Sequence, residues 1–357
     1  MLLTGLGLGI ALGFTMQRGR FCVTGGFRDL WIARKTRWLT AFLIVIAVQS
    51  VGVFALDALG VIKLVPKDFP WLAVIIGAFI FGFAIVLAGG CATGTIFRAG
   101  EGLVGSWFAL VFYAIFATIT KAGPLAPLTH ALRGVSTETS TIHGMLGISP
   151  WILVGTLLLI VGLLVRYHLL EGAKLPTLAT LPPRKTGLAH LFFEKPWGAF
   201  TSALIIAVIA IAAWPLSWVT GRKAGLGITT PFANIGTYLS GGDAAVVDWG
   251  VYLVIGILVG ATIAAKGSGE FRIRMPDAVT TVRAIIGGSL MGIGAVLAGG
   301  CTIGNALVNT ATFGLVGWTS LIFMILGTGV ATRIFIIGSA KGHTTPAAAP
   351  TYASANR

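Results

Sequence analysis

Long apolar runs, separated by short polar connections, dominate this chain. Nine runs of about 15 to 24 residues follow one another, and a helix needs ~20 apolar residues to cross the hydrocarbon core of a bilayer. The pattern therefore predicts an all-α polytopic membrane protein with about nine transmembrane helices. The first run is the shortest of the nine. The runs cover residues 2–16, 38–59, 71–90, 104–122, 150–170, 197–217, 249–266, 283–299 and 315–338.

A sequence repeat interrupts this pattern at two equivalent places. Residues 81–107, FGFAIVLAGGCATGTIFRAGEGLVGSW, return as residues 291–318, MGIGAVLAGGCTIGNALVNTATFGLVGW. In each copy an apolar run ends in LAGGC, a glycine follows three residues after the cysteine, and the apolar character resumes after GLVG. This pattern is typical of a discontinuous membrane helix, in which backbone N–H groups are free at the break. We therefore expect Cys91 and Cys301 to lie at two breaks beside the substrate.

The two copies are predicted to run in opposite senses across the membrane. The break follows the third run in the first half and the eighth in the second, and five runs is an odd number of crossings. The sequence thus predicts an inverted repeat of four spans, a connecting span and four spans, with short loops dipping to the membrane centre. We expect one transmembrane transport domain at 1–338, with a first repeat at about 1–122, a connecting span at about 150–170 and a second repeat at about 197–338.

Composition and charge agree with a membrane protein. The mean hydropathy is +0.93, and 56% of the residues are apolar while only 10% are charged. The net charge is +14, and the basic residues lie between the apolar runs, where they set the orientation of the protein in the membrane. We therefore do not expect nucleic-acid binding. Lysine and arginine accumulate after the first, fifth and seventh runs, which places the N-terminus outside and the C-terminus in the cytoplasm. Residues 339–357, rich in alanine, proline and threonine, are predicted to form a disordered cytoplasmic tail.

The breaks are predicted to bind an anion. Glycine-rich backbone offers converging N–H groups, helix N-termini add partial positive charge, and nearby hydroxyls and an amide supply further donors. No aspartate or glutamate lies in the middle of any run, which argues against a cation transporter or proton pump. Arg20, Arg98 and Arg222 adjoin breaks and are predicted to guide the anion by charge. The predicted substrate-binding residues are Thr24, Gly89, Gly90, Thr93, Gly94, Thr95, Thr229, Thr230, Gly299, Gly300, Thr302, Gly304 and Asn305.

The three cysteines narrow the choice of anion. A buried cysteine is usually a small apolar residue, but Cys22, Cys91 and Cys301 all lie at breaks. In apolar surroundings a thiol keeps its proton, and its S–H group can then donate a weak hydrogen bond to an anionic sulfur. An odd number of cysteines does not describe a disulfide framework. Without a CxxC motif or a neighbouring histidine we expect no metal site and no cofactor.

Four long motifs carry a resemblance to a known family: GFTMQRGRFCVTGGFRD, LAGGCATGTIFRAGEGLVGSW, TGRKAGLGITTPFANIG and LAGGCTIGNALV. Through them the chain, from about residue 5 to 338, resembles the YeeE/YedE group of bacterial membrane proteins that take up thiosulfate. The resemblance implies an hourglass of helices in the bacterial inner membrane, with Cys22, Cys91 and Cys301 passing thiosulfate along by S–H to sulfur hydrogen bonds. It also implies a small cytoplasmic sulfur-carrier protein of the TusA type as a partner.

Two alternatives stay open at this point. Some members of the family are linked to other sulfur or selenium compounds, so the cargo can differ while the fold is kept. In the second alternative the protein is a membrane sulfurtransferase, in which Cys91 or Cys301 accepts a sulfur atom as a persulfide. No base lies near either cysteine in the sequence, and we therefore expect a transporter rather than an enzyme.

Overall fold

The computed structural model describes residues 1–65, 68–173, 186–242 and 244–338, and these ranges form helices and connecting loops. Among the described residues, eight helices are long and apolar enough to cross a membrane, which confirms the predicted all-α polytopic class. β-structure within the same ranges is limited to isolated bridges, such as the one that pairs Leu103 with Arg274. The predicted tail at 339–357 lies outside the described residues.

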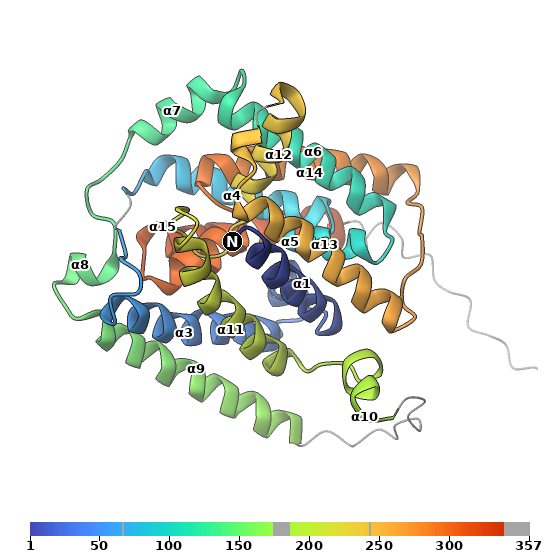
Figure 1. The fold of residues 1–357 in the computed structure, drawn as a ribbon, viewed down its shortest axis with the longest axis horizontal. Helices are drawn as coiled ribbons and strands as arrows, with labels where there is room; N and C mark the ends of the chain where they lie inside the picture. Colours follow the sequence, from blue (N-terminus) through green and yellow to red (C-terminus); the bar gives the residue numbers. More distant parts are fainter. Residues whose placement is uncertain (66–67, 174–185, 243, 339–357) are drawn as a thin grey trace, which may run out of the picture.

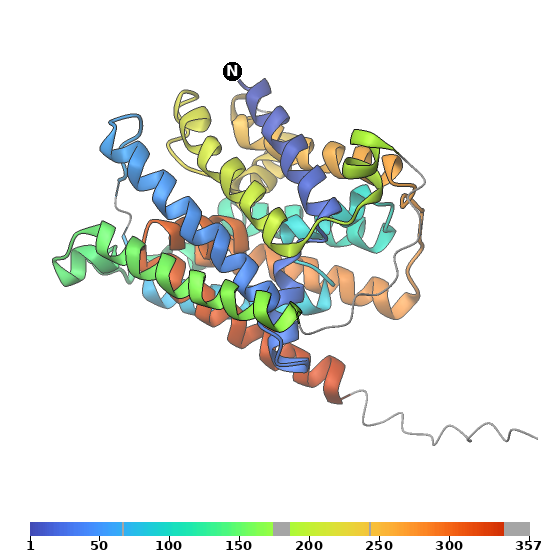
Figure 2. The same cartoon turned by 90° about the horizontal axis from the view of Figure 1, so that it is seen from below.

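The first half of the chain contains six helices, and three more lead to the gap at 174–185. The first six are α1 (Leu3–Arg18), α2 (Val23–Ile32), α3 (Arg37–Ala58), α4 (Trp71–Leu87), α5 (Ala92–Gly100) and α6 (Val104–Ala122). They are followed by α7 (Ala126–Gly134), α8 (Ile142–Leu146) and the long α9 (Pro150–Ala173). Helix α9 lies at the periphery, against α3 (Figures 1 and 2), as its largely unburied apolar surface requires.

The second half repeats this order of long and short helices. It contains α10 (Gly187–Ala189), η1 (His190–Glu194), α11 (Ala199–Trp218), α12 (Thr229–Gly241), η2 (Ala244–Val246), α13 (Trp249–Gly267), α14 (Ala278–Ala298), η3 (Thr302–Asn309), α15 (Leu315–Thr332) and η4 (Arg333–Ile337).

Helix α1 is the one predicted span that is not among the eight helices long and apolar enough to cross a membrane. Its 16 residues extend over about 24 Å at ~1.5 Å per residue, against ~30 Å of hydrocarbon. Its C-terminal turn, from Thr15 to Arg18, is buried in the protein. A count of nine spans therefore stays a prediction, while eight helices meet the length and composition of a span.

Both predicted helix breaks are confirmed. Helix α4 ends at Leu87 and α5 begins at Ala92, while α14 ends at Ala298 and η3 begins at Thr302. In each break the first glycine of the LAGGC segment is left-handed, with φ of +74° at Gly89 and +78° at Gly299. Glycine adopts this conformation without steric cost, so the same turn redirects the chain in both copies.

Helices from the two halves interleave, and their contacts come in matched pairs. Helix α1 packs on α13 as α11 packs on α3, and α6 packs on α14 as α15 packs on α4 (Figure 1). Glycines allow backbones to touch in these pairs: a methyl group at Gly9 would meet the carbonyl oxygen of Leu253, and one at Gly288 would meet the carbonyl oxygen of Ala109. Such small-residue contacts are the usual means of close helix packing in membranes.

Candidate functional site

Each of the three cysteines immediately precedes a short helix. Cys22 is the N-cap of α2, Cys91 of α5 and Cys301 of η3, and all three have an extended backbone there. The first N–H groups of a helix have no partner within it and carry partial positive charge. Cys91 and Cys301 are fully buried and Cys22 is partly buried, and all three are free thiols. Thiols and anion-attracting helix N-termini therefore occupy the same places.

Two of the thiols meet at Gly94, in the first turn of α5. The backbone N–H of Gly94 donates to Sγ of Cys91 at 3.4 Å. A Cβ atom added at Gly94 would lie 3.1 Å from Sγ of Cys22 and 3.4 Å from Sγ of Cys91, so both thiols face the same residue. The fold thus brings together Cys22 and Cys91, which are far apart in the sequence.

The second break approaches the same centre. The hydroxyl of Thr302, next to Cys301, lies near the Cys91 thiol but makes no hydrogen bond to it. The hydroxyl of Tyr113, in the middle of α6, lies near both Cys301 and Cys91. Groups from both halves of the chain therefore surround Cys91.

Three predicted hydroxyl donors at this centre have no partner. The Oγ1 atoms of Thr24, Thr93 and Thr302 are buried without a hydrogen bond to any described residue, and each residue lies in the first turn of a cysteine-capped helix. Leaving a buried polar group unsatisfied costs about 1–3 kcal/mol, so these hydroxyls fit a polar ligand among the thiols.

Two other predicted donors are occupied by the breaks themselves. The hydroxyl of Thr95 donates to the carbonyl oxygens of Gly90 and Cys91. The amide nitrogen of Asn305 donates to the carbonyl oxygens of Ala298 and Gly300. Thr95 and Asn305 therefore hold the shape of their breaks, and a direct contact with substrate stays a prediction for both.

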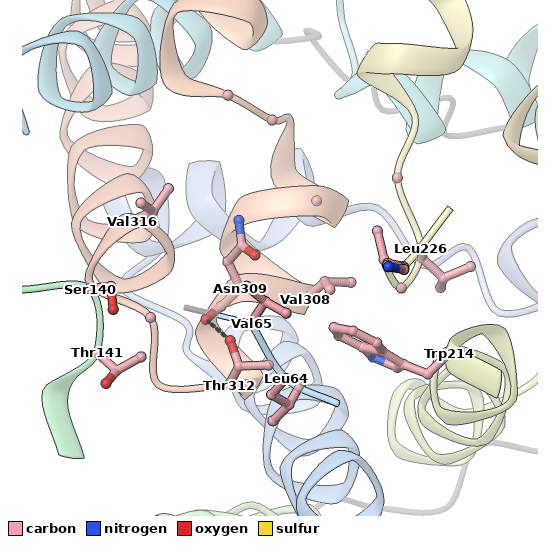
Figure 3. A pocket seen from close by; sticks show the side chains of 18 of the residues that line it. Leu64, Val65, Ser140, Thr141, Trp214, Leu226, Val308, Asn309, Thr312 and Val316 are labelled. Atoms are coloured by element: carbon pink, nitrogen blue, oxygen red, sulfur yellow. Dashed lines mark hydrogen bonds between the residues drawn. The ribbon is translucent and has the colours of Figure 1, made fainter. Parts of the chain in front are cut away.

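A cavity of about 740 Å³ opens onto the second break. Its described lining does not include the three thiols, but it contains six of the predicted site residues. Figure 3 shows an apolar part of its wall, where Trp214, Leu226 and Val308 lie close together. The predicted residues that line it are Arg222, Thr229, Thr230, Gly299, Gly300 and Gly304.

Positive charge dominates this cavity. Four basic side chains line it against two acidic ones. Burial lowers the pKa of the Arg222 guanidinium, and Asp248, 3.8 Å away, opposes this shift. Such a surface attracts anions. The basic residues are Lys63, Arg133, Arg222 and Lys223, and the acidic ones are Asp57 and Asp68.

Sequence reasoning missed Arg133 and Tyr113. Arg133, in α7, donates to the carbonyl oxygen of Leu297 at 3.2 Å and lies beside Gly299; burial lowers its pKa. It belongs to a long connection that gave no sign of contact with a break. Tyr113 did leave a signal, because a tyrosine in the middle of an apolar span, away from the interfaces, needs a buried hydrogen-bond partner.

The two predicted anion guides of the first half lie away from the cavity. Arg20 contacts Glu101 at 3.1 Å and Glu270 at 3.0 Å, so two carboxylates balance its charge. Arg98 lies beside Gly89 and near Cys22. Arg98 is therefore placed to act on the thiol pair, whereas Arg20 is engaged in ion pairs.

These ion pairs lie at the opposite membrane face from the cavity. The backbone N–H of Trp197, just before α11, donates to the carbonyl oxygen of Arg18, while Trp214 and Trp218 at the other end of α11 line the cavity. Helix α11 has 20 residues and therefore spans about 30 Å, which separates the ion pairs from the cavity. Gln17 further links this cluster by donating to Glu101 and to Glu270.

The described residues contain no group of three or more His, Cys, Asp or Glu side chains placed to hold a metal ion. Interrupted helices whose ends converge inside a polytopic helical protein are typical of secondary transporters. A positively lined cavity on one face and a paired-charge cluster on the other agree with that class.

The chain belongs to the sulphur transport family, which it matches over residues 18–330. It is 51% identical over 339 residues to the thiosulfate transporter TsuA of Escherichia coli, covering 94% of this chain and 95% of that protein. It is 34% identical to the TsuA of Spirochaeta thermophila, covering 92% and 97%. The probable transporter YedE of Escherichia coli is 41% identical over 113 residues, or 31% of this chain and 27% of YedE. The resemblance drawn from the four motifs is therefore confirmed.

Proposed function

We propose that this protein takes up thiosulfate across the bacterial inner membrane. The observation that carries the proposal is the placement of three free thiols, each at the N-terminus of a short helix, with unpartnered hydroxyls beside them. Thiosulfate has one sulfur end and one oxygen end, and the site offers S–H groups for the first and O–H and N–H groups for the second. The two TsuA relatives, which align over nearly their whole length, support the same cargo.

The proposed path leads from the cavity to the thiols. The anion enters the cavity beside Arg133 and Arg222 and reaches the second break at Gly299, Gly300 and Gly304. It then passes Cys301, Cys91 and Cys22 by S–H to sulfur hydrogen bonds, without a covalent bond. Thr24, Thr93 and Thr302 hold its oxygens, and Arg98 guides it towards the far side.

We further propose that the two halves are inverted repeats, with the N-terminus outside and the C-terminus in the cytoplasm. The matched helix pairs support this arrangement, because an inverted two-fold relation makes α1 against α13 equivalent to α11 against α3. Basic connections fall on the face of the Arg20 cluster, which the positive-inside tendency assigns to the cytoplasm. The cavity then opens to the outside.

The driving force must overcome the membrane potential. Moving a dianion inwards against ~100 mV costs about 4.6 kcal/mol, from ~2.3 kcal/mol per charge. We propose that consumption of thiosulfate in the cytoplasm, by a sulfurtransferase or a TusA-like sulfur carrier, draws the anion inwards. Accumulation by the isolated protein under a proton gradient alone would replace this proposal with symport.

Uptake of ³⁵S-thiosulfate into proteoliposomes tests the cargo, with sulfate, selenite and sulfite as unlabelled competitors. We expect thiosulfate to compete at least tenfold better than sulfate. Preferred competition by a selenium or other sulfur species would instead assign that compound as the cargo. A mass increase of one sulfur atom on Cys91 after exposure to substrate would favour the sulfurtransferase.

Cysteine variants test the path in cells that lack their own thiosulfate uptake, grown on thiosulfate as sole sulfur source. We expect Cys91→Ala to abolish growth, and Cys22→Ala and Cys301→Ala to slow it. Thr156→Ala is a control, because Thr156 is exposed on α9 and its hydroxyl bonds only to its own helix. Full growth by all three cysteine variants would reject the thiol path.

A further inference from the structure

Tyr113 is a fully buried tyrosine in the middle of a membrane helix, and its hydroxyl is aimed at the site. It is 0% exposed and donates a hydrogen bond of 3.0 Å to Oγ1 of Thr229. Thr229 begins α12 and lines the cavity. The same phenol group lies near Cys301 and Cys91. One hydroxyl thus connects the wall of the cavity with the thiols.

The surrounding helices fix the position of this hydroxyl. The ring of Tyr113 packs edge-on against Phe232, with centroids 5.2 Å apart. A methyl group added at Gly292 of α14 would lie 2.7 Å from the carbonyl oxygen of Tyr113, so α14 lies directly against its backbone. Helices α6 and α12 are joined a turn later by the hydroxyl of Thr118, which donates to the carbonyl oxygen of Ala233. A donor held in this way loses little entropy when it binds a ligand.

Packing alone does not explain why this position holds a tyrosine. A phenylalanine in the same place would pack on Phe232 equally well and would need no partner, whereas the tyrosine hydroxyl must be hydrogen-bonded when buried. Its acceptor, Thr229, lies in the wall of the cavity from which the proposed path leads to the thiols. The hydroxyl therefore stands where an anion would lose the water of the cavity and need replacement donors.

We propose that Tyr113 contacts the substrate and determines selectivity, its hydroxyl turning from Thr229 to an oxygen of the anion as the anion passes from the cavity to the thiols. This inference rests on the proposed uptake of a sulfur oxyanion. Tyr113 binds the oxygen end while the thiols contact the sulfur end, so both ends of the anion are recognised at once. Thr229 holds the hydroxyl in place when no anion is present.

Tyr113→Phe removes only the hydroxyl and tests the proposal by uptake kinetics in proteoliposomes, normalised to folded protein. Because a hydrogen bond to a charged group is stronger than one between neutral groups, we expect KM for thiosulfate to rise about tenfold or more. Tyr238→Phe is the matched control, since Tyr238 lies exposed on α12, and its KM should stay within about twofold. A lower folded yield of Tyr113→Phe with unchanged KM would show a structural role and overturn the proposal.

Variants of Thr229 keep the test independent of the tyrosine. Thr229→Ser retains the acceptor and should take up thiosulfate like the wild type, whereas Thr229→Val should be impaired. The double variant Tyr113→Phe, Thr229→Val should be no worse than Tyr113→Phe alone, because Thr229 acts through the hydroxyl that the first change removes. Equal impairment of the serine and valine variants would contradict the proposal. Failure of the wild type to take up thiosulfate rejects the proposed function, whereas normal KM in Tyr113→Phe rejects this inference alone.

Discussion

The two copies of the LAGGC segment share a sequence and a backbone turn but differ in their surroundings. At the first break, Gly94 is enclosed by the sulfurs of Cys22 and Cys91. At the second, the equivalent Gly304 has no atom within 4 Å of an added Cβ, and it lines the cavity. The same motif thus forms a closed thiol contact in one half and an open cavity wall in the other. The difference teaches that surrounding helices, rather than the motif, decide which break meets solvent.

The residues that hold the two breaks provide the strongest test of this comparison. Asn305 donates hydrogen bonds to Ala298, Gly300 and Ser320, whereas Thr95 bonds only to carbonyls of its own break. Asn305→Ala leaves several buried groups unsatisfied and should lower the free energy of unfolding by about 2–4 kcal/mol, while Thr95→Ala should lower it by about 1 kcal/mol. Denaturation of the purified variants in detergent measures both. Equal losses would show that the two breaks are held alike.

The next largest effect is expected at the glycines three residues after Cys91 and Cys301. Gly94→Ala places a methyl group between two thiols and should reduce thiosulfate uptake about tenfold, a loss of ~1.4 kcal/mol in transition-state stabilisation. Gly304→Ala points into open space and should stay within about twofold of the wild type. Alanine is favoured over glycine in helices by about 1 kcal/mol, so unfolding does not explain a loss at Gly94. Equal uptake by the two variants would remove the distinction between the breaks.

A smaller effect is expected from the arginine beside the open break. Arg133→Gln removes a charge from the cavity and should raise KM about fivefold at low ionic strength. Because salt screens charges beyond about 10 Å at 0.1 M, the defect should shrink as salt is added. Arg133→Lys keeps the charge and is the matched control. A defect that is independent of salt would indicate that Arg133 acts on the fold through Leu297 rather than on the anion.

The smallest effect concerns His143, which also lines the cavity. Burial lowers the pKa of its imidazole, so it is protonated only below the ordinary value of ~6.5 and is neutral from there upwards. Its charge does not contribute to attraction of the anion at neutral pH. His143→Gln should therefore leave the uptake profile between about pH 6.5 and 8 unchanged. A fall in wild-type uptake across this range that the variant abolishes would contradict this assignment.

The sequence predicted the helical class and the position of both breaks because these features are local. The apolar runs and the repeated glycines are each visible in a short stretch of neighbouring residues. The glycines also explain the turn at Gly89 and Gly299. The argument on inverted halves predicted that breaks of the two halves meet, but Cys22 and Cys91 both belong to the first half. The contact through Gly94 needed the structure.

Other parts of the site depend on tertiary contacts that no local pattern records. Thr95 and Asn305 have the donor groups that an anion site needs, but the nearest acceptors are carbonyls left free by the breaks, and these take the hydrogen bonds. Arg133 reaches Gly299 from a connection more than 150 residues earlier, as its bond to Leu297 shows at a separation of 164 residues. Tyr113 has its role only because α12 begins beside α6.

The interleaved helices constrain how the protein can move during a transport cycle. Rocking of one half against the other as rigid bodies would have to pull α1 from α13 and α4 from α14, where backbones touch at Gly9 and Gly294. Contacts of α11 with α3, α6 with α14 and α15 with α4 join the two halves at further places. In the proposed path, exposure of the central thiols to either side would then come from small rearrangements of short segments such as α5 and η3, inside a frame that stays fixed.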